Sequence, residues 1–123
     1  SVWLGFFLHE VLRRFAPVAH LHGDDAFAQW CDTQAQLLRN QLEAHAWDGG
    51  WYRRAWFDDG TPLGSASSDE CRIDSISQSW AVLSGAGDQT RVHQAMAALD
   101  AQLVKPQAGL IQLLDPPFDR TAH

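Results

Sequence analysis

Polar side chains that can bind sugar hydroxyls gather between residues 69 and 78. Asp69, Glu70, Arg72, Asp74 and Gln78 occupy a polar loop and the first turn of the helix expected after it. Carboxylates accept hydrogen bonds from hydroxyl groups, and guanidinium and amide groups donate them. The local alternative is Asp74 as a helix N-cap, with Glu70 and Arg72 as an exposed ion pair worth under about 1 kcal/mol. The pattern fits both interpretations.

The segment from 51 to 57 is rich in aromatic residues. Trp51, Tyr52 and Trp56 carry flat apolar faces that can stack on a pyranose ring. Strand alternation places Trp51 with Arg53 on one side and Tyr52 with Trp56 on the other, so only one set can face a cleft. Packing of these rings against helices is the alternative role.

Arg53 and Arg54 follow the first aromatic pair of this segment. Adjacent guanidinium groups can attract a phosphate group. The alternative is a pair of exposed ion pairs with neighbouring carboxylates such as Asp58 and Asp59.

The histidines and cysteines form no recognisable metal or nucleophile site. None of the 6 histidines falls in an HExxH or comparable ligand pattern. Cys31 and Cys71 have no CxxC or Cys/His cluster around them. We therefore expect no metal site and two reduced, partly buried cysteines, with one disulfide as the alternative.

Length and composition predict one packed soluble domain. The chain has 123 residues, 46% of them hydrophobic and 20% charged, which excludes a disordered or collagen-like composition. A net charge of -6 has the wrong sign for a nucleic-acid partner. No apolar run reaches the roughly 18 residues of a membrane span, because Gly5, His9 and Glu10 interrupt the best candidate.

Apolar periodicity predicts a first pair of helices. The first runs from 2 to 16, is bent or ended by Pro17, and precedes a turn at Gly23. Asp24 is the expected N-cap of a second helix that ends near Ala46. The faces expected to be buried are Trp3, Leu4, Phe7, Leu8, Val11, Leu12 and Phe15 in the first helix, and Phe27, Trp30, Cys31, Leu37, Leu38 and Leu42 in the second.

The remaining elements complete a mainly α pattern. We expect a β-hairpin over 51–64, a third helix over 74–84 and a fourth that Asp88 caps, with a last short strand over 109–114. The inward residues of these two helices are Ile76, Trp80 and Leu83, and Val92, Met96, Leu99 and Leu103. Two antiparallel helix pairs with an inserted hairpin are typical of solenoids and of α/α toroids.

Two long stretches, 46–65 (AWDGGWYRRAWFDDGTPLGS) and 69–85 (DECRIDSISQSWAVLSG), resemble the glycoside hydrolase family 94 phosphorylases and transferases. The run Arg72-Ile73-Asp74-Ser75-Ile76 is similar to the β-1,2-glucan branch, which contains the C-terminal region of cyclic β-1,2-glucan synthases and the related oligoglucan phosphorylases. The resemblance implies an (α/α)6 barrel of which residues 1–123 form a middle part.

The resemblance also implies a reaction. This is inverting phosphorolysis or transfer on β-linked glucans, with inorganic phosphate as co-substrate and without a metal or organic cofactor. The general-acid motif should precede the position matching Ser1, and the phosphate-holding histidine stretch should follow that of Thr121. We therefore expect no catalytic residue in this chain and no activity from it alone. The residues expected to bind the glucan oligosaccharide are Glu70, Arg72, Asp74, Gln78, Trp51 and Arg53.

The chain begins at Ser1 and its only methionine is Met96, which favours a processed chain or a fragment of a larger barrel domain. We expect a cytoplasmic location, with any inner-membrane attachment made by regions outside this chain. The wide apolar arc of the first helix predicts self-association of the isolated chain. The alternatives are a free-standing carbohydrate-binding module and a helical interaction module, and the absence of a fixed repeat period counts against the second.

Overall fold

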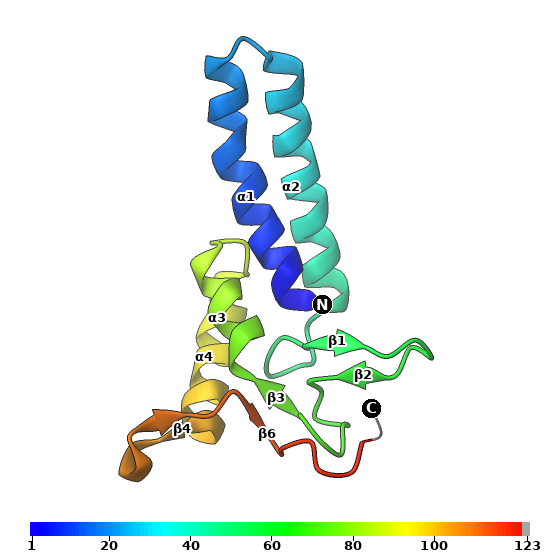
Figure 1. Ribbon diagram of the computed structural model, residues 1–123, viewed down its shortest axis with the longest axis vertical. Coiled ribbons are helices and arrows are strands. Elements are labelled where there is room, and N and C mark those ends of the chain that lie inside the picture. Colours follow the sequence, from blue (N-terminus) through cyan, green and yellow to red (C-terminus); the bar gives the residue numbers. More distant parts are fainter. Residues whose placement is uncertain (122–123) are drawn as a thin grey trace.

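The computed structural model describes residues 1–121, and within them the fold is mainly α-helical (Figure 1). The helices are α1 (Val2–Leu21), α2 (Asp25–His45), α3 (Ser75–Leu83) and α4 (Gln89–Leu103), with a short 3-10 turn, η1 (Pro106–Ala108). The strands are β1 (Ala55–Trp56), β2 (Pro62–Leu63), β3 (Ile73–Asp74), β4 (Val104–Lys105), β5 (Leu110–Ile111) and β6 (Leu114–Asp115). The long pair α1–α2 and the shorter pair α3–α4 confirm the two predicted antiparallel pairs.

The helix α1 continues through Pro17, so of the two effects expected of this residue, a bend or an end, the end is wrong. A proline inside a helix removes the N–H that would bond the carbonyl of residue 13. Pro17 and Arg13 are both exposed, which leaves that carbonyl open to water. The helix ends only at His22 and the positive-φ Gly23, whose N–H donates to the His20 carbonyl at 2.9 Å.

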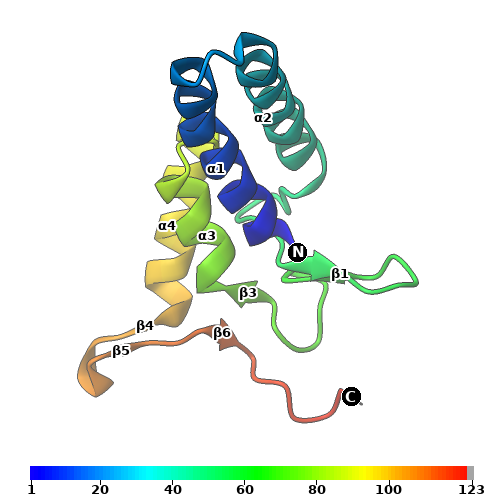
Figure 2. The same cartoon turned by 45° about the horizontal axis from the view of Figure 1, so that its top comes forward.

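The buried face of α1 differs from the predicted stripe. Its buried residues are Val2, Phe6, His9, Ala16 and Ala19, while Leu4, Phe7, Leu8, Val11 and Phe15 are 40–49% exposed. Figure 2 shows α1 between α2 and α3, so only part of its circumference has a packing partner. Because α1 is apolar around most of its circumference, periodicity alone did not identify the face that would be covered.

The helix α2 begins where predicted, since the Asp24 carboxylate accepts a hydrogen bond from the Phe27 N–H at 3.0 Å. Its predicted inner face is only partly correct. Cys31 and Leu42 are buried, whereas Trp30 is 50% exposed and stacks on Phe27 with the ring centroids 5.4 Å apart. The buried residues of α2 are Cys31, Ala35 and Leu42, while Phe27 meets Phe15 of α1 edge-on with the ring centroids 6.0 Å apart and stays partly exposed.

The helices α3 and α4 carry the predicted N-caps, Asp74 and Asp88. Leu99 and Leu103 are buried as expected, whereas Leu83 is 65% exposed and Met96 is also exposed. Leu83 is the last residue of α3, and no described element covers that side of it.

The strands form three separate two-stranded antiparallel sheets within the described residues. The predicted hairpin is present, with Ala55 opposite Leu63, but its paired strands are only two residues long. The single strand predicted for 109–114 is wrong. β5 pairs with β4, and β6 pairs with β3, a partner about forty residues earlier in the chain that periodicity did not reveal.

The core lies where α1, α2 and α3 meet the first residues of the hairpin segment. Tyr52 is fully buried and meets Phe6 edge-on with the ring centroids 5.1 Å apart. Cys31 and Cys71 are buried free thiols. Within the described part of the chain, no helix is both long enough and apolar enough to cross a membrane.

Candidate functional site

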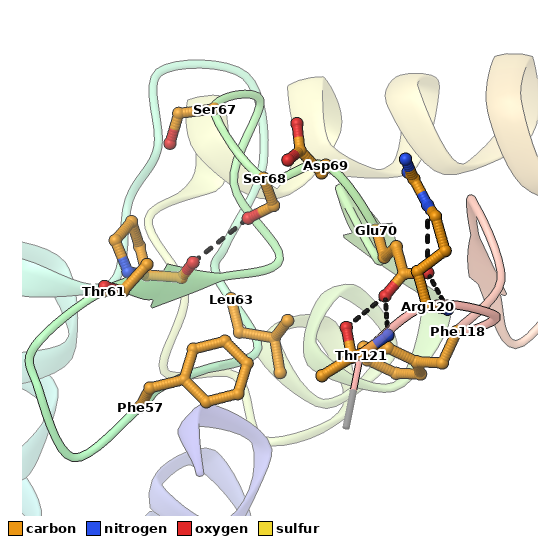
Figure 3. Close-up of a pocket in the computed structure, with 11 residues that line it drawn as sticks. Phe57, Thr61, Leu63, Ser67, Ser68, Asp69, Glu70, Phe118, Arg120 and Thr121 are labelled. Carbon is orange, nitrogen blue, oxygen red and sulfur yellow. Dashed lines mark hydrogen bonds and ion pairs between the residues drawn. The ribbon is translucent and has the colours of Figure 1, made fainter. Parts of the chain in front are cut away.

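A hollow of about 370 Å³ lies between the hairpin, the loop before β3 and the last described residues (Figure 3). Its floor is apolar and includes Phe57, Leu63 and Phe118. Its polar walls are formed by Thr61, Ser67, Ser68, Asp69, Glu70, Arg120 and Thr121. An apolar floor with a few surrounding hydroxyl and charged groups is typical of a small-molecule site.

The wall of the hollow depends on tight backbone packing at Gly64. This residue has φ +79°, its N–H donates to the Cys71 carbonyl at 2.9 Å, and its carbonyl accepts from the Trp51 indole at 2.9 Å. The same indole N–H lies 2.8 Å from the Arg72 carbonyl. Trp51 is therefore half-buried inside the scaffold and ties the two ends of the loop together.

Glu70 holds the far wall of the hollow in place. It is only 6% exposed, and its carboxylate accepts hydrogen bonds from the backbone N–H groups of Asp119 (2.8 Å), Arg120 (2.7 Å) and Thr121 (3.0 Å). The Thr121 hydroxyl donates to it as well (Figure 3). The Thr121 hydroxyl and then the Asp119 N–H stabilise the charged form and lower the pKa of Glu70 to about 2. The predicted surface pair with Arg72 is not formed, because Arg72 donates to the Ser68 carbonyl.

We expect the N–H signals of residues 119–121 to titrate with Glu70. Its folded-state pKa of about 2 lies below the ordinary glutamate value, so the anchoring is complete above about pH 4.3 and is lost as the pH falls through about 2. Glu70→Gln should abolish this titration and loosen the segment, measured as amide shifts and hydrogen exchange by NMR. Asp69→Asn, a change at the exposed neighbour, is the control. It should alter neither the titration of the amide shifts nor the hydrogen exchange of residues 119–121. A midpoint near 4.3 would show that the anchor is absent.

Asp74 lies beneath the hollow and does not reach it. Its side chain is fully buried, accepts from the Ser77 N–H at 3.0 Å and forms an ion pair with Arg54 at 2.9 Å. The pairing of Arg54 with Asp58 or Asp59 considered from the sequence is therefore wrong. This ion pair connects the hairpin to the start of α3.

Gln78 is also fully buried, and its amide serves the backbone. It accepts from the Tyr52 N–H at 2.8 Å, and donates to the carbonyls of Tyr52 at 2.8 Å and Asp74 at 3.0 Å. These three bonds occupy the amide and leave it no free polar group for a sugar. Gln78 thereby fixes the backbone of Tyr52, the residue that follows Trp51.

Arg53 forms an ion pair with Asp48 at 2.8 Å rather than with a hairpin-tip carboxylate, which corrects the second ion pair considered from the sequence. Partial burial raises the pKa of Asp48, but the Ala66 N–H and the Arg53 side chain outweigh it and hold this pKa below its ordinary value. The Arg53 guanidinium also donates to the His45 carbonyl at 3.2 Å. Arg53 thus joins the end of α2 to the loop that borders the hollow.

Of the six predicted substrate-binding residues, Glu70 alone lines the hollow, with Asp69 beside it. The other five lie around or beneath it. The sequence reasoning did not single out Phe57, Thr61, Phe118 or Arg120. Phe118 and Arg120 lie about fifty residues beyond Glu70, and no local signal connects the two segments.

A second polar cluster that the sequence did not indicate joins the two helix pairs. Glu43 accepts from the Tyr52 hydroxyl at 2.7 Å and from the Arg91 guanidinium at 2.7 Å. Burial and then the Glu43 hydrogen bond raise the pKa of Tyr52 above its ordinary value. This cluster sets the position of α4 relative to the end of α2.

The family assignment rests on a match along the whole chain. The family model described as "Glycosyl hydrolase 94 superfamily, catalytic domain" matches residues 1–123. The chain belongs to this superfamily. The resemblance inferred from 46–65 and 69–85 is thereby confirmed, and the hollow lies within a catalytic domain of the glycosyl hydrolase 94 superfamily.

Curated relatives in the glycosyl hydrolase 94 superfamily agree with this assignment. The cyclic beta-(1,2)-glucan synthase NdvB of Rhizobium meliloti (strain 1021) is 47% identical over 121 residues, which are 98% of this chain and 4% of that protein. The 3-O-beta-D-glucopyranosyl-beta-D-glucuronide phosphorylase and the solabiose phosphorylase of Paenibacillus borealis are 35% and 34% identical, each over 96% of this chain and 15% of the relative. The chain thus spans a small part of the relatives it matches.

Proposed function

We propose that this chain is part of a catalytic domain that performs inverting phosphorolysis or transfer on β-linked glucans, with β-1,2-glucan as the substrate class. The 47% identity with a cyclic beta-(1,2)-glucan synthase along 98% of the chain carries this proposal. The (α/α)6 barrel belongs to the same proposal, and the two antiparallel helix pairs support it. Two buried free thiols are compatible with a reducing compartment and hence with the cytoplasmic location we propose.

In this proposal the hollow binds part of the glucan chain. Phe57 and Phe118 provide apolar rings for the C–H face of a pyranose, and Asp69 offers an exposed carboxylate to its hydroxyl groups. Glu70 contributes by holding the wall that carries Arg120. We assign Trp51, Arg53, Arg72, Asp74 and Gln78 to the positioning of these walls, because their polar groups bond to the scaffold.

The proposed reaction needs one carboxylic acid to protonate the glycosidic oxygen while phosphate attacks the anomeric carbon from the opposite face. The C–O bond to the leaving sugar breaks, a C–O bond to phosphate forms, and a β-linkage yields an α-sugar 1-phosphate. Glu70 is unsuited to the role of the acid, because its pKa of about 2 leaves it ionised at neutral pH. The resemblance implies that the general-acid motif precedes the position matching Ser1, so we propose that the acid lies outside this chain.

Two measurements test the proposed function. The complete protein that carries this chain should release α-glucose 1-phosphate from β-1,2-linked gluco-oligosaccharides in the presence of phosphate. The isolated chain should release none. Release from β-1,4-linked substrates alone would contradict the proposed linkage. Turnover by the purified isolated chain would show that one of its own carboxylates acts as the acid, with Asp69, the exposed carboxylate of the hollow, the first to replace.

The second candidate is a free-standing carbohydrate-binding module, favoured by the exposed side chain of Trp56 in strand β1 of the hairpin. Titration of tryptophan fluorescence with gluco-oligosaccharides distinguishes the two candidates. Saturable binding by the isolated chain, together with an inactive complete protein, would favour the binding module over the enzyme.

We also propose that the isolated chain self-associates through α1. Phe7, Val11 and Phe15 remain 40–47% exposed on α1, even though Phe7 meets Trp80 and Phe15 meets Phe27 edge-on. Each fully exposed large apolar side chain costs roughly 1.5–3 kcal/mol, so a partner that covers them is favoured. Light scattering over a dilution series should detect a dimer or larger species. Val11→Glu should shift the mass toward the monomer, and Gln94→Glu on α4 should not. A monomer at every concentration, with intact helical circular dichroism, would contradict self-association.

A further inference from the structure

A second polar hollow, of about 450 Å³, lies between α1, α2 and the turn that follows α3. It shares no lining residue with the first hollow. In Figure 1 the end of α3 comes beside the middle of α1, well above the hairpin and the loops of the candidate site. The proposed function of the chain makes no use of this place.

His9 lines this hollow and lacks a partner. It is only 8% exposed, and its Nδ1 is buried with no hydrogen-bond partner among residues 1–121. A buried polar atom without a partner is destabilising, and a ligand or water that bonds to it at this position removes that cost. Burial, and then the positive charges of Arg13 and Arg39, lower the pKa of His9.

Positive charge is concentrated around His9. Arg13, Arg14 and Arg39 line the hollow, three of the 9 Lys and Arg residues in a chain whose net charge is -6. Glu10 also lines it and pairs with Arg14, so these two charges offset each other. The positive charges of Arg13 and Arg39 are the surplus that no carboxylate lining the hollow offsets.

Both surplus arginines have guanidinium groups that can bind a ligand. Arg39 donates through Nε to the Ala86 carbonyl at 3.0 Å, which fixes the side chain and leaves its terminal nitrogens. Arg13 lies 3.9 Å from Asp32, and both side chains are more than half exposed, so this pair is weak.

Ser84 adds a buried hydroxyl to the same hollow. It is 6% exposed, and its Oγ accepts from the Ala86 N–H at 3.2 Å, which leaves its own hydrogen for another acceptor. Donors therefore converge from α1 (His9, Arg13), from α2 (Arg39) and from the end of α3 (Ser84). Donors arriving from three directions suit a tetrahedral oxyanion.

We infer that this hollow is a binding site for a phosphate group, supplied as inorganic phosphate or as a phosphorylated sugar. The arginines neutralise the dianion, His9 gains the partner that its Nδ1 lacks, and the Ser84 hydroxyl gains an acceptor for its hydrogen. The carboxylate of Glu10 opposes an anion, but it pairs with Arg14, and the Ala86 carbonyl in the turn after α3 already accepts from the Nε of Arg39. In the proposed function the reacting phosphate is held by a stretch beyond the position matching Thr121, so the phosphate site inferred here is an additional one.

Titration of the full chain with inorganic phosphate, followed by NMR, tests the inference. Saturable shifts should appear at His9, Arg39 and Ser84, and the His9 pKa should rise, since a bound anion favours the imidazolium form. Arg13→Gln and Arg39→Gln should each weaken binding about tenfold. Lys105→Gln, which removes one positive charge from β4, should change the affinity for phosphate less than twofold.

A parallel titration with a hexose phosphate identifies the source of the phosphate group, and tighter binding than that of inorganic phosphate would assign the sugar ester. Circular dichroism of each variant separates lost binding from lost folding. The inference is overturned if no saturable shift appears up to tens of millimolar phosphate, if the shifts fall at Arg120 in the first hollow, or if Lys105→Gln weakens binding as much as Arg39→Gln does.

Discussion

Gly64→Ala is expected to lower the free energy of unfolding by about 2–5 kcal/mol, the sum of a strained left-handed backbone and an overpacked contact. Gly64 has φ +79°, and a Cβ there would lie 2.4 Å from the backbone nitrogen of Arg54 and 2.8 Å from its Cβ. Arg54 has little freedom to withdraw, because its N–H donates to the Leu63 carbonyl at 2.8 Å and its side chain is paired with Asp74.

Gly60→Ala is the matched control for this substitution. Gly60 has φ +85°, but a Cβ there would meet nothing within 4 Å. It should therefore show the backbone cost alone, about 1–2 kcal/mol. Urea denaturation of both variants, followed by circular dichroism, measures the difference. Equal losses of stability in the two variants would mean that the crowding at Gly64 is relieved by a shift of the hairpin.

Asp74→Ala is expected to cost about 3–5 kcal/mol, because it leaves Arg54 without its buried partner and the start of α3 without its cap. The Asp74 side chain is fully buried, and its two oxygens bond to Arg54 at 2.9 Å and to the Ser77 N–H at 3.0 Å. Asp74→Asn keeps an oxygen for the cap and removes the charge, so its loss of stability should be intermediate.

Asp88→Ala provides the comparison for Asp74→Ala. Asp88 is also an N-cap, with its carboxylate 3.0 Å from the Arg91 N–H, but it is exposed and forms no ion pair among the described residues. Its replacement should cost about 1 kcal/mol, the value of a cap alone. If both replacements cost the same, the Arg54 pair contributes nothing, and Asp74 acts only as a cap.

The sequence by itself determined the features that depend on neighbouring residues. The caps Asp24, Asp74 and Asp88 lie where short-range patterns predicted them, because a cap bonds an N–H three residues away. The hairpin turn and the membership of the glycosyl hydrolase 94 superfamily were also predicted correctly, because contiguous motifs indicate both. Pro17 is the exception among the local signals, since its exposed position in α1 removed most of the cost of a proline inside a helix.

Only the tertiary structure decided which face of α1 is buried, because an apolar arc that wide offers several faces and the covered one depends on where α2 and α3 lie. The role of Glu70 was decided in the same way. Its partners lie 49 to 51 residues further along the chain, so no local pattern distinguished an anchored carboxylate from an exposed one. Burial and long-range hydrogen bonds depend on elements that are distant in the sequence and that come into contact only when the chain folds.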